Sequence, residues 1–190
     1  MTDKDLVEKI KNGDHNSFKV MIENHQRLIL NTCKGFLHNE EDAHDVAQDV
    51  FIEAYRSIKK FRGDSKITTW LYRIAVNKSL NFIRDNRKHK QVNNIDLMYS
   101  KGEKHLAIES NPVLPDVELE NRERSVVLFN AIDELPKKQR KAFILNKYEN
   151  LNYKEISEIM KKSVSSIESL LFRAKRNLQE KLYNYYKDNL

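Results

Sequence analysis

Glycine, proline and cysteine are scarce in this sequence of 190 residues, which has 4 glycines, 3 prolines and 1 cysteine. So few turn-forming residues disfavour a turn-rich β-sandwich, a collagen-like repeat and a flexible low-complexity chain. The single thiol, Cys33, excludes an intrachain disulfide and a cysteine zinc site, and its apolar neighbours favour a place in a core. We therefore expect an all-α protein that holds no metal and no other cofactor.

Long apolar runs are absent as well. No stretch of about 18 apolar residues is available to span a membrane, and the first residues, MTDKDLVEKIKNGDHN, lack the apolar segment of a signal peptide. We therefore expect a cytoplasmic protein that does not insert into membranes. A glycine-rich phosphate loop, a nucleophile elbow and a zinc signature are also missing, which argues against an enzyme.

The net charge of +6 conceals larger blocks of opposite sign. The net charge is +1 over residues 1–37, −5 over 38–58, +8 over 59–90, −3 over 91–124 and +5 over 125–190. The two basic blocks predict surfaces for a polyanion, and the acidic block predicts a surface for a different partner. Solvated helix faces that happen to cluster would give the same pattern, so charge alone leaves both interpretations open.

The periodicity of apolar residues divides the chain into three segments. Residues 1–89 and 121–190 repeat apolar residues at helical spacing, whereas 90–120 loses this periodicity and holds one glycine and two of the three prolines. The third proline, Pro136, suits the first turn of a helix, where its missing N–H has no partner to lose. We expect two small helical domains joined by a flexible linker.

The helix predicted over 42–58 has an apolar side and an acidic side. Ile52 falls on the acidic side, where a merely solvated face would not place it. We interpret this side as a docking face for a basic protein surface. A metal site built from nearby histidines and carboxylates is disfavoured, because His44 projects about 100° away from Asp45 around the helix.

A second helix, predicted over about 66–88, carries a stripe with the opposite character. Cations neutralise phosphates, amides read base edges and an aromatic ring stacks on an exposed base. A solvated face would carry more acids, so the stripe favours nucleic acid, although a tryptophan alone at this spacing is more typical of a core. The stripe consists of Lys66, Trp70, Arg73, Asn77, Asn81, Arg84 and Lys88.

Two capping patterns near the C-terminus predict a helix-turn-helix. Asn152 with Glu155, and Ser165 with Glu168, each fit an N-cap and its reciprocal acidic partner. The second helix would then begin at about 165 and present small hydrogen-bonding side chains followed by arginines, an arrangement that suits a major groove. An ordinary helical hairpin with a polar outside would show the same pattern.

Three separated stretches resemble the extracytoplasmic-function sigma factors of bacterial RNA polymerase, in order and in spacing. They are DAHDVAQDVFIEAYRSI at 42–58, FRGDSKITTWLYRIAVN at 61–77 and LPKKQRKAFILNKYENLNYKEISEIM at 135–160. The resemblance implies sigma region 2 over 1–89, a linker over 90–120 and sigma region 4 over 121–190. It implies a non-catalytic promoter-specificity subunit that is a monomer when free, with core RNA polymerase, promoter DNA and an inhibitory anti-sigma factor as partners.

The resemblance also implies which residues meet each partner. Those expected to bind the polymerase clamp are Asp45, Gln48, Asp49 and Ile52. Those expected to recognise and melt the −10 element, with the loop over 61–69 holding a flipped base, are Phe61, Arg62, Lys66, Thr69, Trp70, Arg73, Asn77, Arg84 and Lys88. Those expected to read the −35 element are Ser165, Ser166, Glu168, Ser169, Arg173 and Arg176.

Two alternatives stay open at this point. Glu168 stands where many members of the family have a basic residue. It could accept a hydrogen bond from a cytosine amino group, or it could cap the helix together with Ser165. Of these two roles, capping is favoured. The alternative function is a helix-turn-helix regulator that acts without polymerase. Such a regulator would have no need of an acidic docking face.

Overall fold

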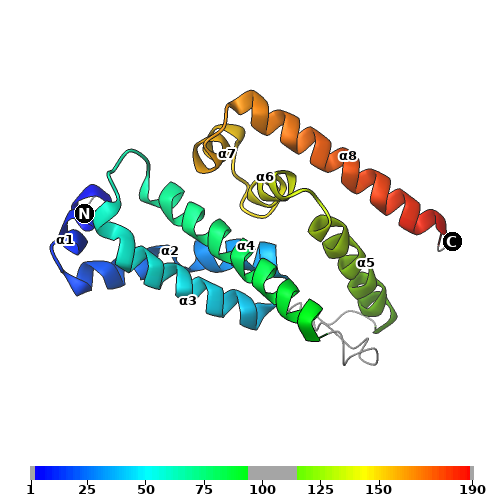
Figure 1. Cartoon of the computed structure of the whole chain (residues 1–190), viewed down its shortest axis with the longest axis horizontal. Helices are drawn as coiled ribbons and strands as arrows, with labels where there is room; N and C mark the ends of the chain where they lie inside the picture. The colour runs from blue at the N-terminus through cyan, green and yellow to red at the C-terminus, as the bar shows by residue number, and fades with distance from the viewer. Residues whose placement is uncertain (1–2, 94–114, 189–190) are drawn as a thin grey trace. The chain divides into compact units, whose positions relative to one another are not determined.

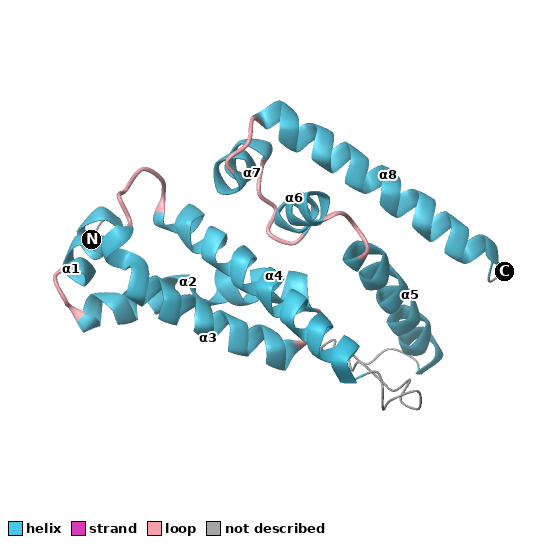
Figure 2. Cartoon of the chain, in the orientation of Figure 1, coloured by secondary structure: helices cyan, strands magenta, loops and turns pink. Residues whose placement is uncertain are grey.

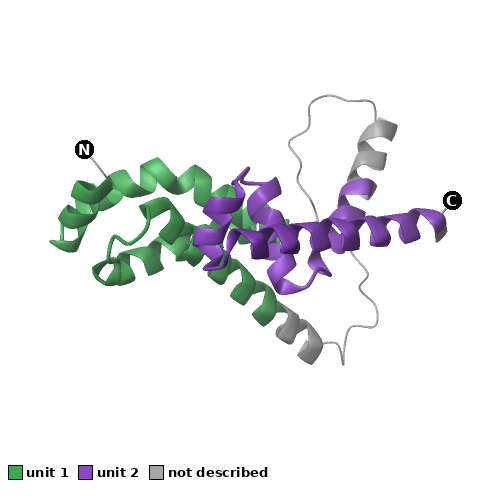
Figure 3. Ribbon diagram, turned by 90° about the horizontal axis from the view of Figure 1, so that it is seen from above, with its two compact units in different colours: residues 1–105 green, residues 106–190 purple. Residues whose placement is uncertain are grey.

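The computed structural model describes the backbone of residues 3–93 and 115–188 and the side chains of 3–86 and 124–187. Within these ranges all regular secondary structure is helical, which confirms the expected all-α fold (Figures 1 and 2). Contacts divide the chain into two units, residues 1–105 and 106–190 (Figure 3). Each unit is described by itself below.

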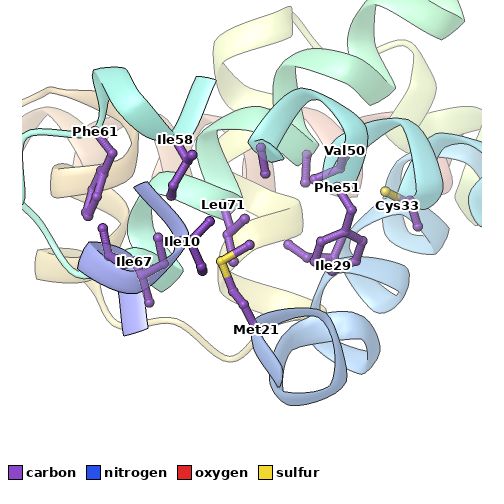
Figure 4. Packing of buried hydrophobic residues seen from close by; sticks show 14 of the residues in the cluster. Ile10, Met21, Ile29, Cys33, Val50, Phe51, Ile58, Phe61, Ile67 and Leu71 are labelled. Carbon is purple, nitrogen blue, oxygen red and sulfur yellow. The ribbon is translucent and has the colours of Figure 1, made fainter. Parts of the chain in front are cut away.

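Unit 1 is a bundle of long helices with a short helix at one end. The elements are α1 (Asp3–Lys11), α2 (His15–Leu37), α3 (Glu40–Ser57), the 3₁₀ helix η1 (Ile58–Lys60) and α4 (Ile67–Asn93). Helices α2, α3 and α4 pack against one another in pairs, and α1 packs against α2 and η1. Their apolar faces enclose one core that includes Met21, Ile29, Val50 and Leu71 (Figure 4).

Polar caps set where α2 and α3 begin. The Asp14 carboxylate accepts hydrogen bonds from the backbone N–H groups of Asn16 and Ser17, at 2.9 and 3.4 Å. The Asn39 side chain accepts from the Asp42 N–H at 2.8 Å. Each cap satisfies N–H groups that the first turn of a helix leaves without partners. Three acids in the first turn of α3 also favour its start through the helix dipole.

The two-sided character predicted for 42–58 is confirmed in α3 and η1. Every residue assigned to the apolar side is buried, and Ile52 on the other side is 48% exposed. The buried set is Ala43, Val46, Ala47, Val50, Phe51, Ala54 and Ile58. The predicted core role of Cys33 is also confirmed, since this residue is fully buried.

Unit 2 is built around its longest helix. The elements are α5 (Pro115–Asp133), α6 (Lys137–Lys147), α7 (Tyr153–Met160) and α8 (Val164–Asp188), and each of the first three contacts α8. The inner side of α8 is buried as predicted at Ile167, Leu171 and Ala174. Helix α7 and the start of α8 form the expected helix-turn-helix.

One of the two predicted caps is confirmed and the other is wrong. Asn152 accepts from the Glu155 N–H at 3.0 Å while the Glu155 carboxylate accepts from the Asn152 N–H at 2.9 Å, which is the predicted capping box. Helix α8, however, begins at Val164, and the Ser166 N–H donates to Ser163 Oγ at 3.3 Å. Ser163 caps this helix because it directly precedes the first helical residue, whereas Ser165 already lies within the first turn.

Helix extends into the segment 90–120 from both sides. Helix α4 continues to Asn93, and α5 begins at Pro115, which was expected to lie in the linker. A proline at the first helical position is favourable because its fixed φ suits the helix and the missing N–H would have no partner there. Residues 94–114, which hold the rest of that segment, lie outside the described residues.

None of the described helices is both long and apolar enough to cross a membrane.

Candidate protein and nucleic-acid interfaces

The acidic face of α3, defined as Asp45, Gln48, Asp49 and Ile52, is exposed along its length. Its acids do not stand alone. Lys78 of α4 places its Nζ 4.0 Å from Asp49 Oδ2 and 3.8 Å from Glu53 Oε2. Periodicity within one helix could not show this contact, because it depends on how α3 and α4 pack.

An apolar hollow of about 600 Å³ adjoins the acidic face. Gln48 and Ile52 line it from α3, together with His15, Phe18 and Ile22 from α2. The ring of Tyr55, 42% exposed, meets Phe18 edge to face at 4.8 Å between centroids. The face therefore offers an apolar surface bordered by carboxylates, which is how the apolar core and polar rim of a protein interface are arranged. Ile52 is predicted from the sequence, whereas Tyr55, three residues further along the same helix, is not.

Some residues of the stripe on α4 are exposed and others are partly buried. Lys66, Asn77, Asn81 and Arg84 are exposed, and Arg73 is half-buried. Asp85 accepts a hydrogen bond from Arg84 Nε at 2.9 Å, which raises the pKa of Arg84 above its usual value. Arg84 therefore remains charged, and the neighbouring carboxylate of Asp85 partly neutralises its positive charge. The Lys88 side chain lies outside the described residues.

The aromatic residues expected at the −10 element pack against each other. Phe61 is 8% exposed, and its ring lies 5.2 Å from that of the half-buried Trp70. The loop predicted over 61–69 is shorter, because α4 begins at Ile67 and includes Thr69, which is 6% exposed. Arg62, on the loop between η1 and α4, is exposed. Of these four side chains, Arg62 lies on the surface, Trp70 lies at its edge, and Phe61 and Thr69 lie beneath it.

The outer face of α8 carries most of the residues expected there. Ser165, Glu168, Ser169, Arg173 and Arg176 are exposed, while Ser166 is half-buried. The correction of the cap changes the interpretation of Glu168. Since Ser163 caps α8, Glu168 is not needed at the cap, contrary to the interpretation that sequence favoured.

Arginines and an aromatic ring extend this face along α8. Arg173 Nε donates to the Ser169 carbonyl at 3.2 Å, and Arg176 Nε lies 3.3 Å from Glu180 Oε1. Phe172, which sequence analysis missed, is 67% exposed and shares a shallow hollow with Glu168, Ser169 and Arg173. A helical projection of α8 places Phe172 outside the apolar inner side, so its exposure could have been predicted from the sequence.

No group of three or more His, Cys, Asp or Glu side chains within the described ranges is arranged to hold a metal ion.

Both units match family models. The model for Sigma-70 region 2 matches residues 21–89, and the model for Sigma-70, region 4 matches residues 125–178. The RNA polymerase sigma-H factor of Pseudomonas aeruginosa is 33% identical over 185 residues, covering 95% of this chain and 93% of that protein. The ECF RNA polymerase sigma-E factor of Escherichia coli K12 is 30% identical over 187 residues, covering 96% of this chain and 95% of that protein.

Solved structures share the fold. CnrH in complex with the cytosolic domain of CnrY matches with a TM-score of 0.66 and 20% identity, covering 96% of this chain and 97% of that one. The sigma factor RpoE in complex with the anti-sigma factor NepR from Bartonella quintana matches with a TM-score of 0.60 and 22% identity, covering 87% of this chain and 96% of that one.

Proposed function

This chain belongs to the extracytoplasmic-function sigma factors of bacterial RNA polymerase, and we propose that its three surfaces divide the work of promoter recognition among polymerase, the −10 element and the −35 element. As a sigma factor it is a transcription initiation subunit and not an enzyme. In this proposal residues 1–89 act as region 2, residues 121–190 act as region 4, and 90–120 link them.

The acidic face of α3 binds core polymerase. The observation that carries this step is the exposed Ile52 among carboxylates, beside the apolar hollow formed with α2. Carboxylates attract and orient a basic partner, while burial of the isoleucine and the hollow supplies the apolar contact. A helix-turn-helix regulator that acts without polymerase would leave this surface unused.

The loop over 61–66 and the exposed stripe of α4 bind the −10 element. Arg62, Lys66 and Arg84 neutralise phosphates, and Asn77 lies where its amide can meet a base edge. Trp70 is positioned by Phe61 and offers part of its ring for stacking. Phe61 and Thr69, both buried, act by shaping the loop from below. Binding of an unstacked base offsets an unstacking cost of about a few kcal/mol, and this favours melting.

The outer face of α8 reads the −35 element in the major groove. Ser165 and Ser169 lie near the N-terminal end of the helix, and Arg173 and Arg176 follow, where they reach base edges or phosphates. Glu168 is available to accept from a cytosine amino group, and the exposed Phe172 is available for a thymine methyl group.

The protein acts in the cytoplasm and is held inactive by an anti-sigma factor. Two solved structures of the same fold are complexes in which a sigma factor or CnrH is bound by another protein. A partner that covers the acidic face of α3 would block core polymerase by competition. The expected result is that the chain, once bound to such a partner, no longer associates with core polymerase.

Run-off transcription tests the assignment of the acidic face. Asp49→Arg should lower the affinity for bacterial core polymerase more than tenfold and abolish transcription from a promoter library, because it places a cation against a basic partner. Glu23→Arg is the matched control, since Glu23 is an exposed acid of α2 paired only loosely with Lys19 at 4.0 Å. Equal core affinity of the two variants would refute the assignment. DNA binding without any stimulation of core polymerase by the wild type would favour the stand-alone regulator.

A further inference from the structure

A hollow of about 830 Å³ lies between α1 and the loop that leads into α4. Lys4, Glu8 and Lys11 line it from α1, and Arg62 and Lys66 line it from the loop. Its volume is within the range of about 300–1,000 Å³ that small-molecule sites occupy. No pattern in the sequence predicts a role for α1 in binding.

Packing and one hydrogen bond hold the two walls together. Lys11 Nζ donates to the Phe61 carbonyl at 2.6 Å, across 50 residues of sequence. Ile10 of α1 and Ile67 of α4 are buried in the same core, and Figure 4 shows both close to Ile58 and Phe61. Gly63, with φ at +83°, gives the loop a turn that most side chains resist. Helix α1 is therefore a fixed wall of the hollow.

The lining combines cations with two carboxylates, Asp3, which also interacts electrostatically with His25, and Glu8. Within the described part of the chain, no ion pair or side-chain hydrogen bond engages Glu8, and this residue is exposed. Lys4, Arg62 and Lys66 supply positive charge around it. Cations suit the phosphates of a nucleotide, and a carboxylate accepts from an exocyclic amino group of a base.

We propose that α1 forms one wall of the pocket that receives an unstacked base of the promoter's single strand, and that Glu8 selects a base with an exocyclic amino group against thymine. This inference rests on the proposed binding of the −10 element by the loop. It adds a second element to the site and a residue that determines specificity. In this arrangement Lys4 meets a phosphate and contributes affinity without selectivity.

A selection experiment tests the role of Glu8. Single-stranded DNA with six randomised positions is selected by the full chain assembled with bacterial core polymerase, using wild type, Glu8→Ala and Asp5→Ala. Asp5→Ala is the matched control, because it also removes one negative charge from α1, and Asp5 does not line the hollow. We expect the wild type to disfavour thymine at one position by about tenfold, the effect of one good hydrogen-bonded pair.

The outcomes separate this inference from the proposal beneath it. Glu8→Ala should abolish the discrimination at that position alone, while Asp5→Ala keeps it. Unchanged selectivity of Glu8→Ala would overturn the role of α1 and leave the loop as the reader. A wild type without preference at any position would overturn the reading of single-stranded DNA itself. AMP or CMP, added at the same concentration as the single-stranded DNA, should not displace that DNA. Displacement would indicate a site for free nucleotides and would also overturn the inference.

A second variant tests the phosphate contact. Lys4→Ala should weaken binding to all selected sequences alike. It should also reduce the slope of log affinity against log salt concentration by about one, the value expected for the loss of one phosphate contact. A change in base preference with Lys4→Ala would contradict the division of roles between Lys4 and Glu8.

Discussion

The Nζ of Lys78 on α4 lies 4.0 Å from Oδ2 of Asp49 on α3, so the basic helix provides a cation to the acidic face that is proposed to bind polymerase. The same ammonium lies 3.8 Å from Glu53. A cationic partner that approaches Asp49 therefore meets a carboxylate that is already partly neutralised. Partly exposed pairs of this kind contribute about 0–1 kcal/mol.

We expect Lys78→Met to raise the affinity for core polymerase about two- to fivefold at low salt, because the acidic face becomes more negative. The gain should shrink at high salt, where exposed charges are screened. Fluorescence anisotropy of the labelled chain with core polymerase measures both effects. Lys19→Met is the control, since this exposed lysine of α2 pairs with Glu23 of its own helix, and no ion pair among the described residues joins it to an acid of α3. A loss of affinity in Lys78→Met would contradict the proposal that core polymerase binds the acidic face through its negative charge.

The ion pair between Arg140 and Asp133 predicts a stability effect confined to unit 2. The Arg140 side chain is 4% exposed and its Nη2 lies 2.5 Å from Asp133 Oδ1, which joins α6 to the end of α5. Arg140→Met should lower the free energy of unfolding of unit 2 by about 3 kcal/mol, because it leaves a partly buried carboxylate without this partner. Hydrogen exchange of α5–α8 peptides measures the loss.

The single tryptophan, Trp70, provides an internal control because it lies in unit 1. Its fluorescence transition in urea should not move in Arg140→Met. Adding Asp133→Leu to that variant should restore part of the stability, since the carboxylate that lost the Arg140 guanidinium is then removed. A double variant less stable than Arg140→Met alone would argue that Asp133 contributes chiefly through other contacts.

The position of the α8 cap predicts different effects for two neighbouring serines. Ser163→Ala should destabilise unit 2 by about 1 kcal/mol, the usual cost of removing an N-cap, and should speed exchange of the Ser166 amide. Ser165→Ala removes only a side chain that contacts Ser163 Oγ at 3.2 Å, so its effect should be smaller. The reverse order would place the cap at Ser165.

His25 predicts a loss of stability in mild acid. This side chain is half-buried, its Nε2 has no hydrogen-bond partner among the described residues, and burial lowers the pKa of the imidazole below its usual 6.5. The unfolded chain therefore binds a proton more readily than the folded one, and stability falls as pH drops below about 6.5. Urea unfolding of unit 1, followed by Trp70 fluorescence at pH 7.5 and 5.5, measures the loss. His25→Gln should reduce this pH dependence, and an unchanged dependence would assign it to other groups.

Local sequence predicted those features that depend on one helix at a time. The burial pattern of α3, the capping box at Asn152 and the inner seam of α8 each follow from a period of 3.6 residues or from side chains three positions apart. The start of α8 was misassigned because Ser163 and Ser165 are both good caps, and the choice depends on the turn that follows α7.

Contacts between helices could not be predicted in this way. Residues far apart in sequence meet only when the core of unit 1 is packed, and this brings Lys78 to Asp49 and Lys11 to the Phe61 carbonyl. The same packing buries Phe61 and Thr69, which sequence placed at the DNA, and exposes Tyr55 beside Ile52. Sequence alone determined the helical class, the two-sided helices and the motifs that carry the family, because these are periodic and local. Only the tertiary structure decided which predicted residues reach the surface and which lie beneath it, since burial is a property of helices packed together.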